Sequence, residues 1–185
     1  MKRGLLIVGV LVLVTLGIGV GSYNALVQRQ EATREAWSQV DNVLQRRYDL
    51  IPNLVNTVKG YAAHERQTLE EISRLRSQWA QATTVAEKVG AATQLEGALA
   101  RLLVVVERYP ELKANQNFLS LQDELAGTEN RIAVERRRYN EAVRHYNVAV
   151  RAFPSNMVAG LTGFRQNDAY FKAGEVAAQA PTVEF

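Results

Sequence analysis

The sequence predicts an all-α protein in which an N-terminal transmembrane helix continues into an up-down antiparallel four-helix bundle. An uncharged apolar run opens the chain, and apolar residues recur at spacings of three and four through the rest. Strand-like alternation and hairpin turn signals are absent from the sequence. We expect a transmembrane anchor at 1–22, a helical bundle at 23–153 and a C-terminal tail at 154–185, packed on the bundle at its start and flexible at its end.

The anchor is predicted from Gly4 to Gly21, a run of 18 residues without a charge. Twelve of its positions are Leu, Ile or Val, which contribute roughly −4 to −7 kcal/mol to membrane insertion. As a helix the run covers about 27 Å, close to the hydrocarbon thickness of a bilayer. The alternative is a cleaved signal peptide, but the run is longer than a usual signal core and no Ala-x-Ala site follows it. A retained, single-pass anchor is therefore preferred.

The residues around the anchor predict its packing and orientation. Gly17 and Gly21 form a GxxxG pair, which favours close packing of two transmembrane helices. Lys2 and Arg3 precede the anchor, and the segment after it carries no net charge. The positive-inside rule therefore predicts a cytoplasmic N-terminus. The anchor is expected to lie in the cell (inner) membrane, with the bundle on the outer side of that membrane.

The charge balance and the absence of cysteine exclude several classes of function. The chain has 22 Lys and Arg against 19 Asp and Glu, and without Lys2 and Arg3 the count is 20 against 19. No single-sign field is available to attract phosphates, so no nucleic-acid partner is predicted. Because the chain has no cysteine, disulfides and thiolate metal sites are excluded.

The first two bundle helices are predicted to meet at Pro52. No breaker separates the anchor from the first helix, so the two are expected to form one rod. Pro52 disfavours helix at Ile51 and suits the first turn of a second helix, which extends to Trp79 with Asp49 as its cap. The alternative is that Pro52 only kinks one very long helix, which leaves three helices in all.

The third and fourth helices have clearer boundaries. The third opens at Thr83 or Thr84 and ends before Pro110, and the fourth ends at Pro154. A strict seven-residue repeat like that of the fourth helix is typical of knobs-into-holes packing in a left-handed bundle. The residues that form it are Phe118, Leu125, Ile132, Tyr139, Tyr146 and Phe153.

The tail beyond Pro154 contains several large apolar residues, among them Met157, Leu161, Phe164 and Phe171. Such residues are not expected to remain in water, so we predict that the first half of the tail folds back on the bundle or is buried at an interface.

Residues that carry catalytic chemistry are few. A carboxylate–histidine site would have to use His64, Glu65 and Glu70, but Thr68 stands where the second histidine of a His-Glu-x-x-His motif is required. Nucleophile elbows, phosphate loops and dinucleotide fingerprints are absent from the sequence. No catalytic, cofactor-binding or metal-binding residue is therefore assigned, and no cofactor is predicted.

Glu65 and Arg136 are two charged residues near the apolar seams of the second and fourth helices. Our hypothesis is that they form a partly enclosed ion pair that sets helix register, since buried pairs fix alignment better than they add stability. The alternative is that both charges are solvated.

Several motifs together resemble the LemA family of bacterial membrane proteins, and they cover nearly the whole chain after the anchor. They are Tyr23-Asn24, Ala36–Asp41, Arg46–Val55, Val58–Ala62, His64-Glu65, Tyr109–Asn115, Glu129–Ala133, Arg138–Asn140, Tyr146-Asn147 and Phe153-Pro154. The resemblance implies an N-terminal membrane helix followed by a helical bundle, and it implies no catalytic or cofactor residues.

The leading functional hypothesis is a non-enzymatic, membrane-tethered helical scaffold that assembles with copies of itself or docks a membrane protein. A second hypothesis is an oligomer that bends or stabilises the bilayer, and a third, less favoured, is a carboxylate–histidine metalloenzyme. The candidates for packing or assembly are large aromatic residues. They are Trp37, Trp79, Tyr139, Tyr146 and Phe164.

Overall fold

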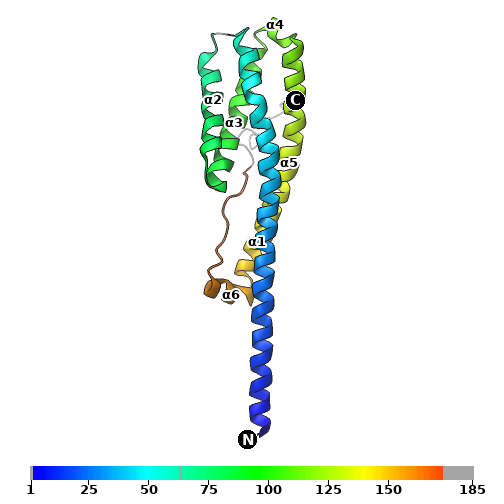
Figure 1. The fold of residues 1–185 in the computed structure, drawn as a ribbon, viewed down its shortest axis with the longest axis vertical. Coiled ribbons are helices and arrows are strands. Elements are labelled where there is room, and N and C mark those ends of the chain that lie inside the picture. Colours follow the sequence, from blue (N-terminus) through cyan, green and yellow to red (C-terminus); the bar gives the residue numbers. More distant parts are fainter. Residues whose placement is uncertain (1, 63, 173–185) are drawn as a thin grey trace, which may run out of the picture. The chain divides into compact units, whose positions relative to one another are not determined.

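The structure, a computed structural model, describes residues 2–62 and 64–172, and within these ranges its regular secondary structure is entirely helical (Figure 1). The predicted all-α class and the long apolar N-terminal helix are confirmed. The helices are α1 (Lys2–Lys59), α2 (Arg66–Gln81), α3 (Val85–Val106), α4 (Pro110–Lys113), α5 (Gln116–Arg151) and α6 (Ser155–Thr162).

Helix α1 is a single helix of 58 residues with Pro52 inside it. The prediction that Pro52 begins a new helix is therefore wrong, although a separate helix still follows at Arg66. A proline has no N–H to donate to the carbonyl one turn earlier, here that of Tyr48. Arg76 of α2 donates its Nε–H to this Tyr48 oxygen at 3.2 Å. The α1 helix continues through Pro52 because the Arg76 side chain donates the hydrogen bond to the Tyr48 carbonyl that the proline cannot donate.

Helix α3 begins where the sequence predicts. Thr84 is the N-cap, and its hydroxyl accepts a hydrogen bond from the Glu87 N–H at 3.2 Å. The Glu87 carboxylate accepts in return from the N–H groups of Thr84 at 3.0 Å and Thr83 at 2.9 Å. These backbone donors, first that of Thr84, lower the pKa of Glu87. The reciprocal capping box fixes the start of the helix.

The seven-residue repeat of α5 is buried along most of its length. Phe118, Ile132, Tyr139 and Tyr146 are each less than 5% exposed. Phe153 keeps the spacing but is 80% exposed, because α5 ends at Arg151. Phe153, the last residue of the repeat, therefore lies outside α5, the helix that contains the other five.

The chain divides into two compact units. The anchor unit comprises Met1–Gln39 and Arg137–Asp168, and the second unit comprises Val40–Arg136 and Ala169–Phe185. The anchor unit contains the start of α1, the end of α5 and the whole of α6. The predicted boundaries at residues 22 and 153, which separate the anchor from the bundle and the bundle from the tail, stay predictions.

The second unit packs helices that are far apart in the sequence. In Figure 1, α2 and α3 are antiparallel neighbours, joined by a short connection. Buried apolar side chains come from α1, α2, α3, α4 and α5, which gives this unit a mainly aliphatic core. Contributors to this core include Leu44, Tyr48, Ile51, Leu54, Ile72, Leu75, Trp79, Leu95, Leu102, Leu112, Phe118 and Ile132.

The tail only partly follows the expectation that it packs. The Phe164 ring meets the Tyr23 ring edge-on at 5.8 Å, and Phe171 is 7% exposed. Met157 and Leu161 are 62% and 88% exposed. The predicted loose end, 174–185, lies outside the described residues.

Candidate membrane-facing site

The apolar start of α1 presents its side chains outward on every side. The Leu, Ile and Val residues between Leu5 and Val20 are each 51–74% exposed. The single polar side chain is satisfied within the helix, because the Thr15 hydroxyl donates to the Leu11 carbonyl at 2.8 Å. A helix with all its backbone groups bonded and an apolar surface all round meets the requirements of a bilayer interior.

Helix α3 is also long and apolar enough to cross a membrane, but it differs from the start of α1 in burial. In the most apolar 18-residue stretch of α3, 39% of the residues are buried, whereas in that of α1 none is. Leu95, Ala98 and Leu102 are each at most 1% exposed. These residues make α3 a core helix of the second unit, so the candidate anchor is the start of α1.

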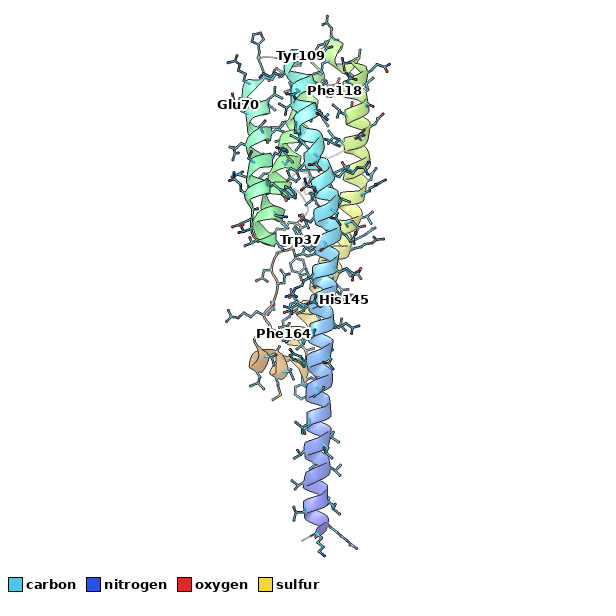
Figure 2. All side chains as sticks on the ribbon, in the orientation of Figure 1. Trp37, Glu70, Tyr109, Phe118, His145 and Phe164 are labelled. Atoms are coloured by element: carbon cyan, nitrogen blue, oxygen red, sulfur yellow. The ribbon has the colours of Figure 1, made fainter. Side chains whose placement is uncertain are left out.

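A small apolar cluster follows the apolar segment within the anchor unit. Leu26 is the first fully buried residue of α1, and it packs with Tyr146 and Val150 of α5 and Ala159 of α6. Phe164 packs against the same cluster from beyond α6 (Figure 2). The three helices of this unit therefore meet at Leu26, five residues after Gly21 and still within the uncharged stretch that extends to Gln28.

Polar side chains of α5 hold the chain that leaves α6. The Tyr146 hydroxyl donates to the Arg165 carbonyl at 2.8 Å, and burial raises the pKa of this tyrosine. Asn147, which is 5% exposed, donates to the Asn167 carbonyl at 2.7 Å and accepts from the Asn167 N–H at 2.8 Å. These bonds pin residues 165–167 against α5.

A shallow groove of about 500 Å³ opens within the anchor unit. Its α1 wall includes Ile18 and Gly21, which belong to the apolar segment. Its opposite wall includes Ala152, the residue after α5, and Pro154, the residue before α6. The turn between α5 and α6 is thus adjacent to the last residues of the apolar segment.

Two largely buried arginines of the second unit form ion pairs between helices. Arg47 of α1, with a side chain 8% exposed, pairs with Glu129 of α5 at 2.5 Å. Arg136 of α5, with a side chain 16% exposed, pairs with Glu96 of α3 at 2.7 Å. The Arg136 guanidinium also lies 4.9 Å from the centre of the Phe171 ring. In the sequence Arg47 lies at helical spacing between the apolar residues Leu44 and Ile51, and a charge at such a position is a signal for a buried ion pair.

An aromatic stack lies beside these pairs in the second unit. The rings of Tyr48 and Trp79 are stacked at 4.1 Å, and the Lys88 ammonium lies 4.8 Å from the Trp79 ring. Lys88 also pairs with Asp41 at 2.8 Å. Burial raises the pKa of Tyr48. The arrangement links α1, α2 and α3 through side chains.

The five aromatic candidates for packing or assembly all have contacts within the chain. Trp79, Tyr139 and Tyr146 are buried, while Trp37 and Phe164 are half-buried. The Trp37 ring, labelled in Figure 2, meets the Tyr139 ring edge-on with the ring centres 5.4 Å apart. Core packing explains each of them, and a role in assembly stays a prediction.

The predicted pair between Glu65 and Arg136 is replaced by other partners. Glu65 accepts from Arg108 at 2.9 Å and from the Tyr109 hydroxyl at 3.1 Å, while Arg136 pairs with Glu96. The prediction placed Glu65 mid-helix because it began the second helix at Pro52. In the structure Glu65 is the N-cap of α2 and lies immediately before its first residue.

The residues proposed for a carboxylate–histidine site are not gathered into one. His64 and Glu70 are exposed, and Glu65 is engaged by Arg108 and Tyr109. In residues 2–62 and 64–172, no group of three His, Cys, Asp or Glu side chains is arranged to hold a metal ion. The close-packing pair Gly17 and Gly21 has open space at each Cβ position and stays a prediction.

Comparison with known proteins identifies relatives over most of the chain. Magnetosome proteins MamQ 1 and MamQ 2 of Paramagnetospirillum magneticum are each 28% identical over 176 residues, which covers 81% of this chain. The chain spans 64% of the length of each, less than two thirds. Protein LemA of Metamycoplasma hominis is 27% identical over 158 residues, covering 85% of this chain and 72% of that protein.

The family comparison agrees with the motifs of the sequence. The LemA family model matches residues 36–185, the part of the chain that follows the apolar segment. None of these relatives' names denotes a reaction, and together with the exposed apolar helix the relatives support a membrane-associated protein. The chain belongs to the LemA family.

Proposed function

We propose that this protein is a non-enzymatic, single-pass membrane scaffold that assembles with copies of itself or docks a membrane protein. The observation that carries the proposal is the apolar start of α1, which is exposed on every side and continues without a break into the packed part of the same helix. Such a helix holds the domain against the inner membrane, and the positive-inside rule places its N-terminus in the cytoplasm.

The packed part of the proposed scaffold is an up-down four-helix bundle. In the second unit α1 contacts α5 through Arg47 and Glu129, and α3 contacts α5 through Glu96 and Arg136. The antiparallel pair α2 and α3 supports this topology, as does the contact of α1 with α2 through Tyr48. Ion pairs between helices give such a bundle a defined register.

The tether is tested by fractionating membranes. The full chain is expected to remain with the membrane after alkaline extraction, and a variant lacking residues 4–21 is expected to be released. Because the chain has no cysteine, Gln67→Cys, an exposed site in the second unit, reports the side of the membrane through an impermeant thiol reagent. Release of the full chain by alkali contradicts the tether.

Self-assembly is tested by crosslinking in native membranes. We expect Gly17→Ile with Gly21→Ile to reduce the crosslinked dimer, because bulky residues prevent close approach of two helices. Gly9→Ile is the matched control, since Gly9 is also an open position in the apolar segment but lies outside the GxxxG pair. A monomer at every protein concentration, with no crosslinked membrane protein, contradicts both assembly and docking.

A second candidate function, direct work on the bilayer, is favoured by the exposed apolar residues of α6 and the turn before it. It predicts that the full-length protein deforms lipid vesicles and that removal of residues 1–22 abolishes the effect. Unchanged vesicle shape at high protein density contradicts this candidate.

A further inference from the structure

We propose that residues 152–164, the corner segment, form a second membrane contact in which Phe153, Met157 and Leu161 enter the boundary between lipid headgroups and acyl chains. The inference rests on the proposed tether, because that tether brings the anchor unit to the bilayer. It adds a contact that the tether itself does not require.

The first observation is the composition of the corner segment. Its thirteen residues contain no charge, and the nearest charged residue on each side is an arginine, Arg151 before it and Arg165 after it. Both arginines are exposed. An uncharged segment between basic residues suits an interface in which apolar side chains meet acyl chains and cations meet lipid phosphates.

The second observation is the division of α6 into two apolar faces. Val158 and Ala159 pack inward against the cluster around Leu26. Met157 and Leu161 lie one turn apart on the outer side, 62% and 88% exposed. The inner face packs against this cluster without help from Met157 or Leu161, so packing within the chain does not account for these two residues.

The third observation is position within the anchor unit. Ala152 and Pro154 share a groove with Ile18 and Gly21 of the apolar segment. Phe164, at the end of the corner segment, meets Tyr23 at 5.8 Å. The exposed residues of the corner segment thus continue the apolar surface of the anchor where that surface ends, which identifies lipid as the occupant.

The fourth observation is that hydrogen bonds fix the corner segment. Ser155 donates to the carbonyls of Ala149 at 2.6 Å and Ala152 at 2.9 Å. Gly163 ends α6 with a φ of 81°, a conformation that a side chain would strain, and its N–H donates to the Ala159 carbonyl at 2.9 Å. With residues 165–167 also pinned, the apolar residues are held outward rather than left loose.

The test measures depth in the bilayer with a fluorophore attached to single cysteines in the full chain, which has none of its own. Met157→Cys and Leu161→Cys carry the probe at the corner segment. Val20→Cys, 61% exposed near the end of the apolar run, is the positive control in the anchor, and Val104→Cys, 72% exposed on α3, is the matched apolar control in the second unit. Each labelled protein is reconstituted in vesicles of phosphatidylcholine and phosphatidylglycerol, with and without lipids brominated near the headgroup end of the acyl chain.

The expected result is a ~2-fold or greater loss of fluorescence from brominated lipid at both corner positions, as for a helix lying in the interface, and little change at Val104→Cys. Quenching in the anchor without quenching at the corner overturns this inference and leaves the tether standing. No quenching in the anchor overturns the tether instead.

Two further outcomes overturn lipid as the occupant. Blue-shifted emission at Met157→Cys and Leu161→Cys without quenching by brominated lipid means that protein, such as a second copy of the chain, covers the corner segment. Equal quenching at Val104→Cys means that exposed apolar residues meet the bilayer wherever they occur.

Discussion

The described buried polar side chains of the anchor unit are neutral, whereas those of the second unit include a charged one, Arg47, beside the neutral Thr128, which bonds to the Leu125 carbonyl. In the anchor unit Thr33 and Asn147 are neutral and bond to main-chain groups, those of Arg29 and Asn167. In the second unit the buried Arg47 side chain pairs with the Glu129 carboxylate, 82 residues away in the sequence.

This difference matches what each unit presents to its surroundings. Ion pairs between distant helices define how the helices of the second unit align. Bonds from neutral side chains to the main chain hold a short segment of the anchor unit in place and leave its apolar residues Phe153, Met157 and Leu161 outside. The second unit is specified by ion pairs between its own helices, and the anchor unit leaves apolar residues exposed for the membrane contact proposed above.

The largest expected effect is that of Trp79→Ala, which tests the packing of the second unit. Trp79 is 5% exposed and stacked on Tyr48, so its loss is expected to lower the free energy of unfolding by about 3–5 kcal/mol. The measurement is chemical denaturation in detergent, followed by far-ultraviolet circular dichroism.

The two tryptophans make this test specific to a unit, because Trp37 lies in the anchor unit and Trp79 in the second. In Trp79→Ala the remaining fluorescence reports the anchor unit, and we expect its transition to shift less than the helical signal. A Trp37 transition that shifts equally shows that the units unfold as one and removes the energetic contrast between them.

Glu129→Gln tests the buried charge of the second unit. It leaves the Arg47 guanidinium without its carboxylate, and because Glu129 is 37% exposed we expect a cost near the low end for such pairs, about 3 kcal/mol. Glu141→Gln in the anchor unit is the control. Its carboxylate is 61% exposed and 3.7 Å from Arg144, so a change within about 0.5 kcal/mol is expected.

A second substitution separates a lost pair from a lost contact. Adding Arg47→Met to Glu129→Gln removes the unpaired charge and is expected to recover much of the lost stability. A double variant no more stable than Glu129→Gln alone is inconsistent with an electrostatic origin of the cost.

The hydrogen bond from Arg76 to the Tyr48 carbonyl predicts an energetic coupling to Pro52. Arg76→Ala is expected to cost about 1–2 kcal/mol, because it leaves a buried carbonyl without a donor. In the Pro52→Ala background the restored backbone N–H takes that carbonyl, so Arg76→Ala is expected to cost about 1 kcal/mol less. Equal costs in both backgrounds contradict the explanation given for the unbroken helix.

Pro52 also shows where the sequence could not predict the fold. Local preference places a boundary at this proline, and the contact that removes the boundary comes from Arg76, 28 residues away along the chain. Where local signals agree with packing, as for the Thr84 cap of α3, the prediction is confirmed. The incorrect boundary at Pro52 also misplaced Glu65 and so produced the wrong ion-pair partner for Arg136.

The candidate membrane-facing site was also only partly predictable from the sequence, because part of it depends on how distant segments pack. The uncharged run in α1 is recognisable from composition alone, because a bilayer-spanning helix requires nothing from the rest of the fold. The exposure of Phe153 and Leu161 depends on where α5 ends and how α6 packs. Periodicity assigned Phe153 to the interior, since a repeat does not reveal the last residue of its helix.

The smallest effect concerns Glu87, a solvent-exposed charge contact that contrasts with the buried pairs of the second unit. Its folded-state pKa is lowered by the N–H groups of Thr84 and Thr83, so its contribution to stability is present above the unfolded-state pKa and is lost as pH falls through the folded-state value. Wild type and Glu87→Gln should therefore differ in unfolding midpoint at neutral pH and converge in acid. Thr84→Ala, which removes a neutral partner, is expected to cost about 1 kcal/mol at neutral pH and to leave a cost in acid. A stability difference between wild type and Glu87→Gln that persists at low pH means that the capping box acts through its geometry and not through the charge of Glu87. The exposed Glu87 and the buried ion pairs would then stabilise the protein by different mechanisms.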